Sequence, residues 1–352
     1  MQRQFWAGRR VFVTGHTGFK GAWLALWLQS LGARVAGYAL KPPSTPSLWA
    51  LVGEKAPIAS TIADIRDLGA LSAVLDTAKP EIVFHLAAQS LVRPSYENPI
   101  DTYATNVMGT VNLLEAVRRA PSVRAVVNVT SDKCYRNLET GQTYREDDAM
   151  GGRDPYSSSK GCAELVTAAY RASFFGDGGA AIASVRAGNV IGGGDWARDR
   201  IVPDTVRAAA AGKPVKVRNP HAVRPWQHVL EPLAGYLQVA QRLCEKPGEY
   251  AEGWNFGPDE ADAVPVEEVV SAVTRLWGPP AGWTSDADQH PHEAGLLRLD
   301  SGKARTRLGW RPRLRLQAAI EWTVDWYKKQ AQGADAMRLT LEQIERYSTL
   351  AT

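Results

Sequence analysis

Two side chains four positions apart, Tyr156 and Lys160, carry the clearest chemical signal in this sequence. On a helix this spacing places both side chains on one face. A free tyrosine, with a pKa of about 10, is a poor base at neutral pH. A neighbouring ammonium group favours the phenolate, so the pair predicts a proton acceptor at Tyr156 that Lys160 supports. Taken alone, the same spacing also fits an ordinary surface pair.

A short polar group, Ser131-Asp132-Lys133, follows directly after an apolar run at residues 125–130. Such a run predicts a buried strand, and the polar group then lies at its carboxyl end. Ligands of parallel α/β sheets bind at that edge. The strand-end serine, together with the tyrosine–lysine pair, therefore favours an active site over a surface pair.

A glycine-rich turn, GHTGFKG at residues 15–21, lies between an expected strand at 10–14 and an expected helix at 18–31. Glycines in this position let a pyrophosphate approach backbone N–H groups at a positive helix end. The GxxGxxG spacing predicts dinucleotide binding. The second expected strand, 34–40, is followed by Lys41 and by no acid for the adenosine ribose, so the residues leave NAD and NADP both open.

Two further segments follow expected strands of the same domain. Asp64 and Ile65 come after a third short strand, where Asp64 either contacts the adenine or caps a helix. The segment HLAAQ, residues 85–89, ends the fourth strand, 82–86, with small residues against which a cofactor can lie. His85, in that apolar run, is expected to be a hydrogen-bonded core residue.

These elements alternate between strands and helices, including two long amphipathic helices at 100–119 and 156–175. The alternation predicts an α/β fold, namely a Rossmann-type doubly wound parallel sheet with a smaller C-terminal substrate-binding cap. We expect a cofactor-binding domain at 1–186, with later strands added from about 225–257, and mainly the cap at 187–352. Helical stretches are expected to be short beyond residue 187, until 316–332.

Composition excludes several other classes of protein. The 352 residues are 45% hydrophobic and 22% charged, which is typical of a globular chain rather than a disordered one. The 41 basic and 37 acidic residues are interspersed, which favours a small polyanionic ligand and no nucleic acid. Three cysteines without a CxxC motif argue against disulfides and a metal site, and predict a cytoplasmic location. No apolar run reaches the ~20 residues of a membrane span, and most of the 12 tryptophans are expected in the core.

Several long strings resemble the extended short-chain dehydrogenase/reductases that act on nucleotide sugars, and among these the CDP-glucose 4,6-dehydratases. The resemblance runs in order from about Trp6 to Asp325. Epimerases of that superfamily lack an Asp-Lys or Asp-Glu pair after the strand-end hydroxyl, and dTDP-glucose dehydratases carry Asp-Glu, so Lys133 favours the CDP branch. The strings are GHTGFKGAWL, TSDKCY, YREDD with GGRDPYSSSKGCAEL, RAGNVIGGGDWARDR and RNPHAVRPWQHVLEPLAGYL.

This resemblance implies NAD as the cofactor and assigns roles to matched positions. Thr105 and Asn106 are both expected to line the cofactor pocket. The implied cofactor-binding residues are Gly15, Gly18, Phe19, Lys20, Gly21, Asp64, Ile65, Leu86, Ala87, Ala88, Thr105, Tyr156 and Lys160. The implied catalytic residues are Ser131, Asp132, Lys133, Tyr156 and Lys160, and the implied substrate-binding residues are Gln89, Ser90, Asn189, Arg200 and Arg224.

The implied substrate is CDP-glucose, and the implied reaction is an internal redox cycle. NAD+ oxidises C4 while Tyr156 takes the hydroxyl proton. Water then leaves from C5 and C6, with Asp132 as candidate acid and Lys133 as candidate base. Hydride returns to C6 and gives CDP-4-keto-6-deoxyglucose. A homodimer or tetramer through the two long helices is expected, because this superfamily usually pairs there.

Three alternatives stay open at this point. A nucleotide-sugar C4 epimerase would share the first oxidation but return hydride to C4. Another sugar-nucleotide dehydratase would differ in the nucleotide that it accepts. A nucleotide-sensing relative would bind without catalysis. The intact Tyr156, Lys160 and Ser131 argue against the sensor, and the Asp132-Lys133 pair argues against the epimerase.

Overall fold

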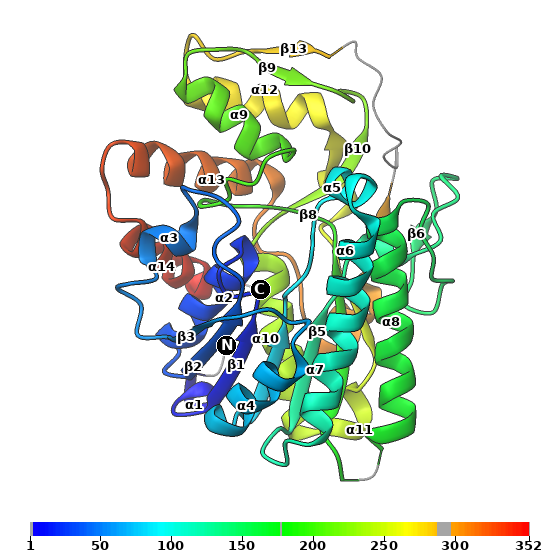
Figure 1. Ribbon diagram of the computed structural model, residues 1–352. Helices are drawn as coiled ribbons and strands as arrows, with labels where there is room; N and C mark the ends of the chain where they lie inside the picture. The colour runs from blue at the N-terminus through cyan, green and yellow to red at the C-terminus, as the bar shows by residue number, and fades with distance from the viewer. Residues whose placement is uncertain (1–2, 177, 287–296, 352) are drawn as a thin grey trace.

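A seven-stranded parallel sheet forms the centre of the computed structural model, which describes residues 3–176, 178–286 and 297–351 (Figure 1). Its strand order is β11-β7-β5-β4-β1-β2-β3: β2 and β3 are added on one side of β1, and β4 and the later strands on the other side. This order confirms the predicted Rossmann-type doubly wound sheet. The strands are β1 (Arg10–Thr14), β2 (Arg34–Ala39), β3 (Ala59–Ile62), β4 (Ile82–His85), β5 (Ala125–Val129), β7 (Ala181–Ala187) and β11 (Gly253–Phe256).

Helices cover both faces of this sheet. Helices α2 (Phe19–Ser30) and α10 (Leu230–Glu245) pack on one face, whereas α4 (Leu68–Ala78), α7 (Gly109–Arg118) and α8 (Pro155–Phe174) pack on the other. Val11 and Val13 of β1 join the core on the α2 side, and Phe12 between them joins the core on the α4 side. Burial on both faces explains why the central strands are apolar at nearly every position.

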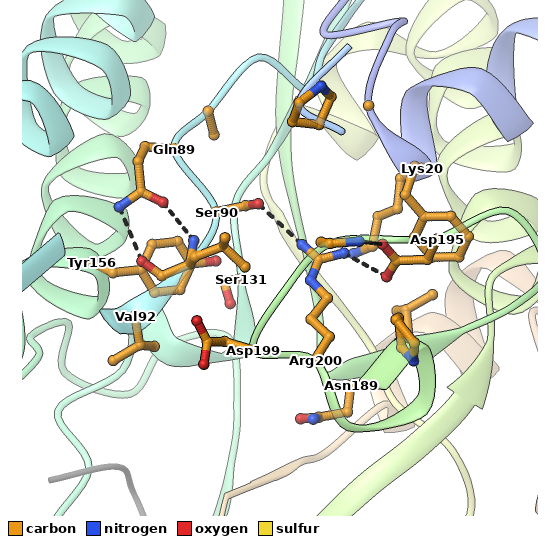
Figure 2. A pocket seen from close by; sticks show the side chains of 18 of the residues that line it. Lys20, Gln89, Ser90, Val92, Ser131, Tyr156, Asn189, Asp195, Asp199 and Arg200 are labelled. Atoms are coloured by element: carbon orange, nitrogen blue, oxygen red, sulfur yellow. Dashed lines mark hydrogen bonds and ion pairs between the residues drawn. The ribbon is translucent and has the colours of Figure 1, made fainter. Parts of the chain in front are cut away.

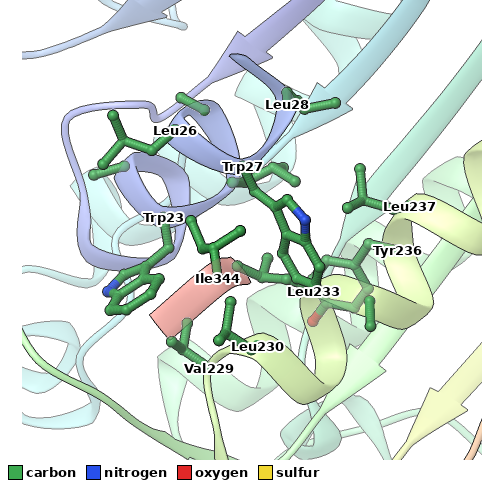
Figure 3. Close-up of a cluster of buried hydrophobic side chains, with 14 of the residues drawn as sticks. Trp23, Leu26, Trp27, Leu28, Val229, Leu230, Leu233, Tyr236, Leu237 and Ile344 are labelled. Carbon is green, nitrogen blue, oxygen red and sulfur yellow. The ribbon is translucent and has the colours of Figure 1, made fainter. Parts of the chain in front are cut away.

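The core between α2 and α10 contains tryptophans, as the sequence predicts (Figure 3). Trp23 and Trp27 are fully buried and lie among leucines of both helices and Ile344 of α14 (Ala336–Thr349). The Trp23 indole N–H also donates to the carbonyl of Gly193, at 2.9 Å. This bond attaches a glycine-rich loop of the second half to the helix that begins at the glycine turn.

The smaller cap lies beyond the carboxyl edge of the sheet, at the top of Figure 1. Its helices are α9 (Ile201–Ala210) and α12 (Val266–Trp277), and α13 (Leu316–Ala331) packs beneath α12. Its strands form two small sheets, β12-β10-β8 and β13-β9. These strands are β8 (Asn189–Ile191), β9 (Val215–Val217), β10 (Val223–His228), β12 (Ala263–Pro265) and β13 (Trp283–Ser285).

One expectation about helices is confirmed and one is wrong. The helix predicted over 100–119 is present as one continuous helical run, in which α6 (Pro99–Tyr103) passes through a π-helical segment (Ala104–Met108) into α7. A stretch expected to hold only short helices contains the 16-residue α10. Pro232 lies in the first turn of α10, where a missing N–H costs nothing, so it does not break the helix.

The remaining elements are short. They are α1 (Arg3–Trp6), α3 (Leu48–Val52), α5 (Val92–Glu97) and α11 (Pro247–Tyr250), the paired strands β6 (Thr143–Tyr144) and β14 (Arg298–Leu299), the 3-10 turns η2 (Asp132–Cys134) and η3 (Glu260–Asp262), and a second π-helical segment (Ala304–Leu308). Among the described residues, none of the helices combines the length and apolar character that crossing a bilayer requires.

Candidate active site

A cavity of about 820 Å³ lies between the carboxyl edge of the sheet and the cap. Apart from Asn106, every site residue assigned from the sequence lines it, from the glycine turn through Tyr156 to Arg224. Figure 2 shows part of this lining, with Lys20, Ser131, Tyr156 and Arg200 contributed by separate segments. The topology therefore brings these residues together, although their individual roles remain predictions.

Close packing at the glycine turn requires glycine at two positions. Gly15 has a φ of +75°, and a Cβ added to it would lie 2.6 Å from the backbone nitrogen of Ala87. A Cβ on Gly21 would lie 2.0 Å from the carbonyl oxygen of Gly15. The turn therefore lies directly against the segment after β4, and α2 begins beside it at Phe19. This arrangement fits a dinucleotide, whose pyrophosphate would lie at the start of α2.

Asp64 lines the cavity and does not cap a helix. The residue that caps α4 is Asp67, whose side chain accepts from the Ala70 N–H. The Asp64 carboxylate instead binds the guanidinium of Arg66, and these hydrogen bonds lower its pKa. Lys41 lines the same cavity.

The loop after β4 is held from behind by Asn106, which is buried and is not a lining residue. Its amide oxygen accepts from the Gln89 N–H at 2.8 Å, and its amide nitrogen donates to the Gln89 carbonyl at 2.9 Å. The expectation that Asn106 lines the cofactor pocket is therefore wrong: it positions the loop that does. His85 is a hydrogen-bonded core residue, as expected, with Nδ1 2.7 Å from the Thr14 hydroxyl.

Tyr156 lies in the first turn of α8, because Asp154 caps that helix by accepting from the Ser157 N–H. Both Tyr156 and Lys160 are buried. Burial raises the pKa of Tyr156 to about 12, although the Ser131 hydroxyl and the Arg200 charge act against this rise. Burial also lowers the pKa of Lys160 to about 8. A cationic ligand beside the phenol would favour its ionised form.

Ser131 caps the 3-10 turn η2 at the end of β5, and Asp132 and Lys133 are the first two residues of that turn. The Ser131 hydroxyl donates to Oδ1 of Asp132 at 2.9 Å, and Lys133 Nζ lies 3.3 Å from the same oxygen. The other oxygen, Oδ2, is buried and has no hydrogen-bond partner among the described residues. Asp132 therefore keeps one carboxylate oxygen that no described side chain uses.

Positive charge gathers on the wall opposite Tyr156. Arg200 donates to Oδ2 of Asp195 at 2.8 Å and to the Ser90 hydroxyl at 3.0 Å (Figure 2). Burial and the nearby Arg200, Lys160 and Lys133 charges lower the pKa of Lys20 to about 7. Such a lining suits a diphosphate, which would stabilise these cations. The sequence analysis did not assign a role to Asp195. Its position in GGGDWARDR, five residues before Arg200, could have indicated a contact between the two side chains.

A second acidic residue, Asp199, links the cap to the cofactor-binding half. Its Oδ1 accepts from Arg93 of α5 at 3.1 Å and from Arg218, just after β9, at 2.6 Å. All three residues line the cavity. The sequence alone offered no signal for this contact, because it joins segments far apart in the chain.

Comparison with known proteins gives a consistent result. The family model described as GDP-mannose 4,6 dehydratase matches residues 12–323. A CDP-glucose 4,6-dehydratase from Salmonella typhimurium is 53% identical over 357 residues, which covers 100% of this chain and 99% of that protein.

Two solved structures share the fold. One is a dTDP-glucose 4,6-dehydratase from Streptomyces venezuelae with NAD bound, which has a TM-score of 0.78 and 24% identity and covers 93% of this chain and 99% of its own. The other is a UDP-glucose 4-epimerase from Thermus thermophilus in complex with NAD, with a TM-score of 0.79 and 25% identity over 91% and 99% of the two chains. Dehydratases and epimerases thus share this architecture.

Gly15→Ala should abolish dinucleotide binding and lower the melting temperature, because the added Cβ meets the backbone of Ala87. Gly8→Ala is a matched control: Gly8 has a φ of +74°, but a Cβ there meets nothing within 4 Å. Both substitutions add backbone strain of about 1–3 kcal/mol. Calorimetry with and without NAD separates the loss of NAD binding from the loss of stability. Equal NAD affinities for the two variants would contradict the role assigned to Gly15.

Proposed function

Because this chain belongs to the GDP-mannose 4,6-dehydratase family of extended short-chain dehydrogenase/reductases, we propose that it converts CDP-glucose to CDP-4-keto-6-deoxyglucose. The sequence resemblance to this family is confirmed. The observation that carries the proposal is the 53% identity, over the whole chain, to a CDP-glucose 4,6-dehydratase. The product forms by loss of water, so the chain is a hydro-lyase.

NAD, the cofactor of the solved relatives, fits the glycine turn and would supply a hydride acceptor at C4 and a hydride donor at C6. The residues of this chain then move the protons. Tyr156 takes the proton of the C4 hydroxyl, and the Lys160 ammonium stabilises the resulting phenolate. Arg200, whose charge lowers the pKa of Tyr156, acts in the same direction.

Elimination of water needs a second acid and a second base. The 4-keto group acidifies the C5 proton, and Lys133 takes it. Transfer of the Lys133 proton to Asp132 across their contact would first give a neutral amine and a carboxylic acid. Asp132 then gives that proton to the C6 hydroxyl, which leaves as water, while the C5–H electrons form the C5–C6 double bond. The contact between Lys133 Nζ and Asp132 Oδ1, at 3.3 Å, places both groups at one point of the cavity.

The epimerase and the nucleotide sensor would each leave some of these side chains without a function. A C4 epimerase needs Tyr156 and Lys160 but leaves the Asp132–Lys133 pair without a role. A nucleotide sensor needs neither a buried phenol nor a buried lysine beside it. Both groups cost free energy to bury, which favours a catalytic function for them.

Incubation with CDP-glucose should produce a 4-ketosugar, detected by its absorbance in alkali. We expect kcat/KM to be far lower for dTDP-glucose and UDP-glucose. Tyr156→Phe is the control, and it should lower kcat by about 10²-fold or more because the proton acceptor is lost. Comparable turnover of dTDP-glucose would assign the protein to the neighbouring dehydratases, and formation of CDP-galactose would identify an epimerase.

Lys133→Met should stop the reaction after the first oxidation. The methionine keeps an apolar stem but removes the group that takes the C5 proton, while Tyr156 and Lys160 are unchanged. We expect absorbance of the reduced cofactor to persist and little solvent deuterium to enter C5. Product formed with normal deuterium incorporation at C5 would show that another group is the base.

A homodimer is proposed through the two long helices. Large apolar side chains are exposed along this part of the chain: Ile100, Met108, Leu165 and Phe174 are 81%, 51%, 60% and 52% exposed. These residues lie on helical segments that contact one another, and large exposed apolar side chains favour a protein partner. Leu165→Glu should convert the dimer to a monomer in sedimentation experiments, and Leu138→Glu, at a loop position 59% exposed, should not. A monomeric wild-type protein would contradict the proposal.

A further inference from the structure

A buried ion pair, Glu164 with Arg186, lies behind the catalytic residues and has no part in the mechanism above. Glu164 is on α8, one turn after Lys160, and Arg186 is on β7. Arg186 donates from Nε to Oε1 and from Nη2 to Oε2 of Glu164, both at 2.8 Å. Each side chain is only 5% exposed. This two-point geometry is the most directional that an arginine and a carboxylate can form.

Hydroxyl groups complete the coordination of the Glu164 carboxylate. Thr130 donates to Oε1, and Ser184 donates to Oε2 at 2.6 Å. Burial opposes ionisation of Glu164, but the Arg186 charge and these donors outweigh it and hold the pKa of Glu164 below its usual value. The carboxylate is therefore ionised and fully hydrogen-bonded at neutral pH.

The remaining donors of Arg186 reach the other side of the catalytic turn. Nη1 donates to the Tyr135 hydroxyl at 2.6 Å and to the Glu146 carbonyl at 3.0 Å. The backbone of Gly253 gives the guanidinium its room, since a Cβ there would lie 2.5 Å from Nη2. The neighbouring strand β11 therefore accommodates this pair through a glycine.

The contacts enclose the catalytic turn η2 at both ends. Thr130 directly precedes Ser131, and Tyr135 directly follows Cys134, the last residue of η2. We propose that Glu164, acting with Arg186, is a positioning residue that fixes the helix carrying Tyr156 and Lys160 against the strand end carrying Ser131, Asp132 and Lys133, and that it supplies a negative charge one helical turn from Lys160. This inference rests on the proposed function for its catalytic meaning.

The electrostatic part concerns the groups around Lys160. Burial lowers the pKa of Lys160, and the charge of Glu164 is the largest influence in the opposite direction. Cys134 also faces Lys160 and acts in that direction. Lys20 and His85 are also in its electrostatic surroundings, since the Lys160 charge lowers the pKa of each, and Tyr156 lies one turn before it on α8. Loss of the Glu164 charge should therefore make Lys160 release its proton at lower pH.

The first test measures the Lys160 pKa without substrate. Glu164→Gln keeps the shape of the side chain and removes its charge. NMR titration of protein with 13C-labelled lysine, with the signal assigned by Lys160→Met, should give a pKa about one unit below the wild-type value. An unchanged pKa would overturn the electrostatic part. Because this titration needs no turnover, it gives the same answer if the wild-type protein fails to dehydrate CDP-glucose, so the two proposals can fail separately.

The second test separates positioning from simple stability. Glu164→Gln should lower kcat by about 10-fold or more with little change in KM. The alkaline limb of its pH–activity profile should lie at lower pH than that of the wild-type protein. Glu231→Gln is the matched control, because Glu231 is a fully buried carboxylate on α10 that accepts from Arg313 N–H, Leu314 N–H and the Tyr347 hydroxyl. It should lower the melting temperature without moving the pH profile.

A double variant covers the case in which Glu164→Gln does not fold. Glu164→Gln with Arg186→Met removes both charges, so no unpaired cation stays buried. The negative charge beside Lys160 is again absent, and the same lowering of its pKa and of kcat is expected. A wild-type pKa and kcat in either folded variant, or a pH profile that moves equally in Glu231→Gln, would overturn the proposal.

Discussion

The parallel alignment of the four central strands is the constraint on which the site depends. Thr14 pairs with His85, His85 with Asn128, and Val129 with Val185. Because the strands run in one direction and end at the same level, the segments that follow them emerge side by side. The glycine turn, the loop after β4 and the turn η2 are far apart in the sequence, yet they form one wall of the cavity.

This alignment also explains the electrostatics. Converging strand ends and a cap exclude water from ionisable groups, and burial is the largest influence on Tyr156, Lys160 and Lys20. The cations act against one another, whereas Asp132 and Glu164 offset them. The net charge of the chain is only +4, so the positive lining comes from the arrangement rather than from composition. An anionic ligand is the natural partner for such a wall.

Local pattern predicted much of the fold and of the cavity lining. Apolar runs located the central strands, because strands buried on both faces need apolar residues throughout. The helix over 100–119 was predicted, but its π-helical segment at residues 104–108 and the length of α10 were missed. Asn106 illustrates the limit: its position in the sequence indicated the pocket, but its amide binds Gln89 from behind. The Glu164–Arg186 pair joins α8 to β7, and spacing along the chain cannot reveal such a contact.

The architecture alone does not decide the reaction, since it matches a dehydratase and an epimerase with similar TM-scores. Both activities begin with oxidation at C4, which the proposed mechanism assigns to Tyr156 and Lys160. Only loss of water needs a further acid and base near C5 and C6, and in the proposed mechanism one short turn supplies both. The Ser131 hydroxyl accepts from the Lys133 N–H at 3.3 Å and donates to Asp132, so it fixes the turn that carries the pair. In the proposed mechanism, the step that separates the two reactions therefore depends on three residues at the end of β5.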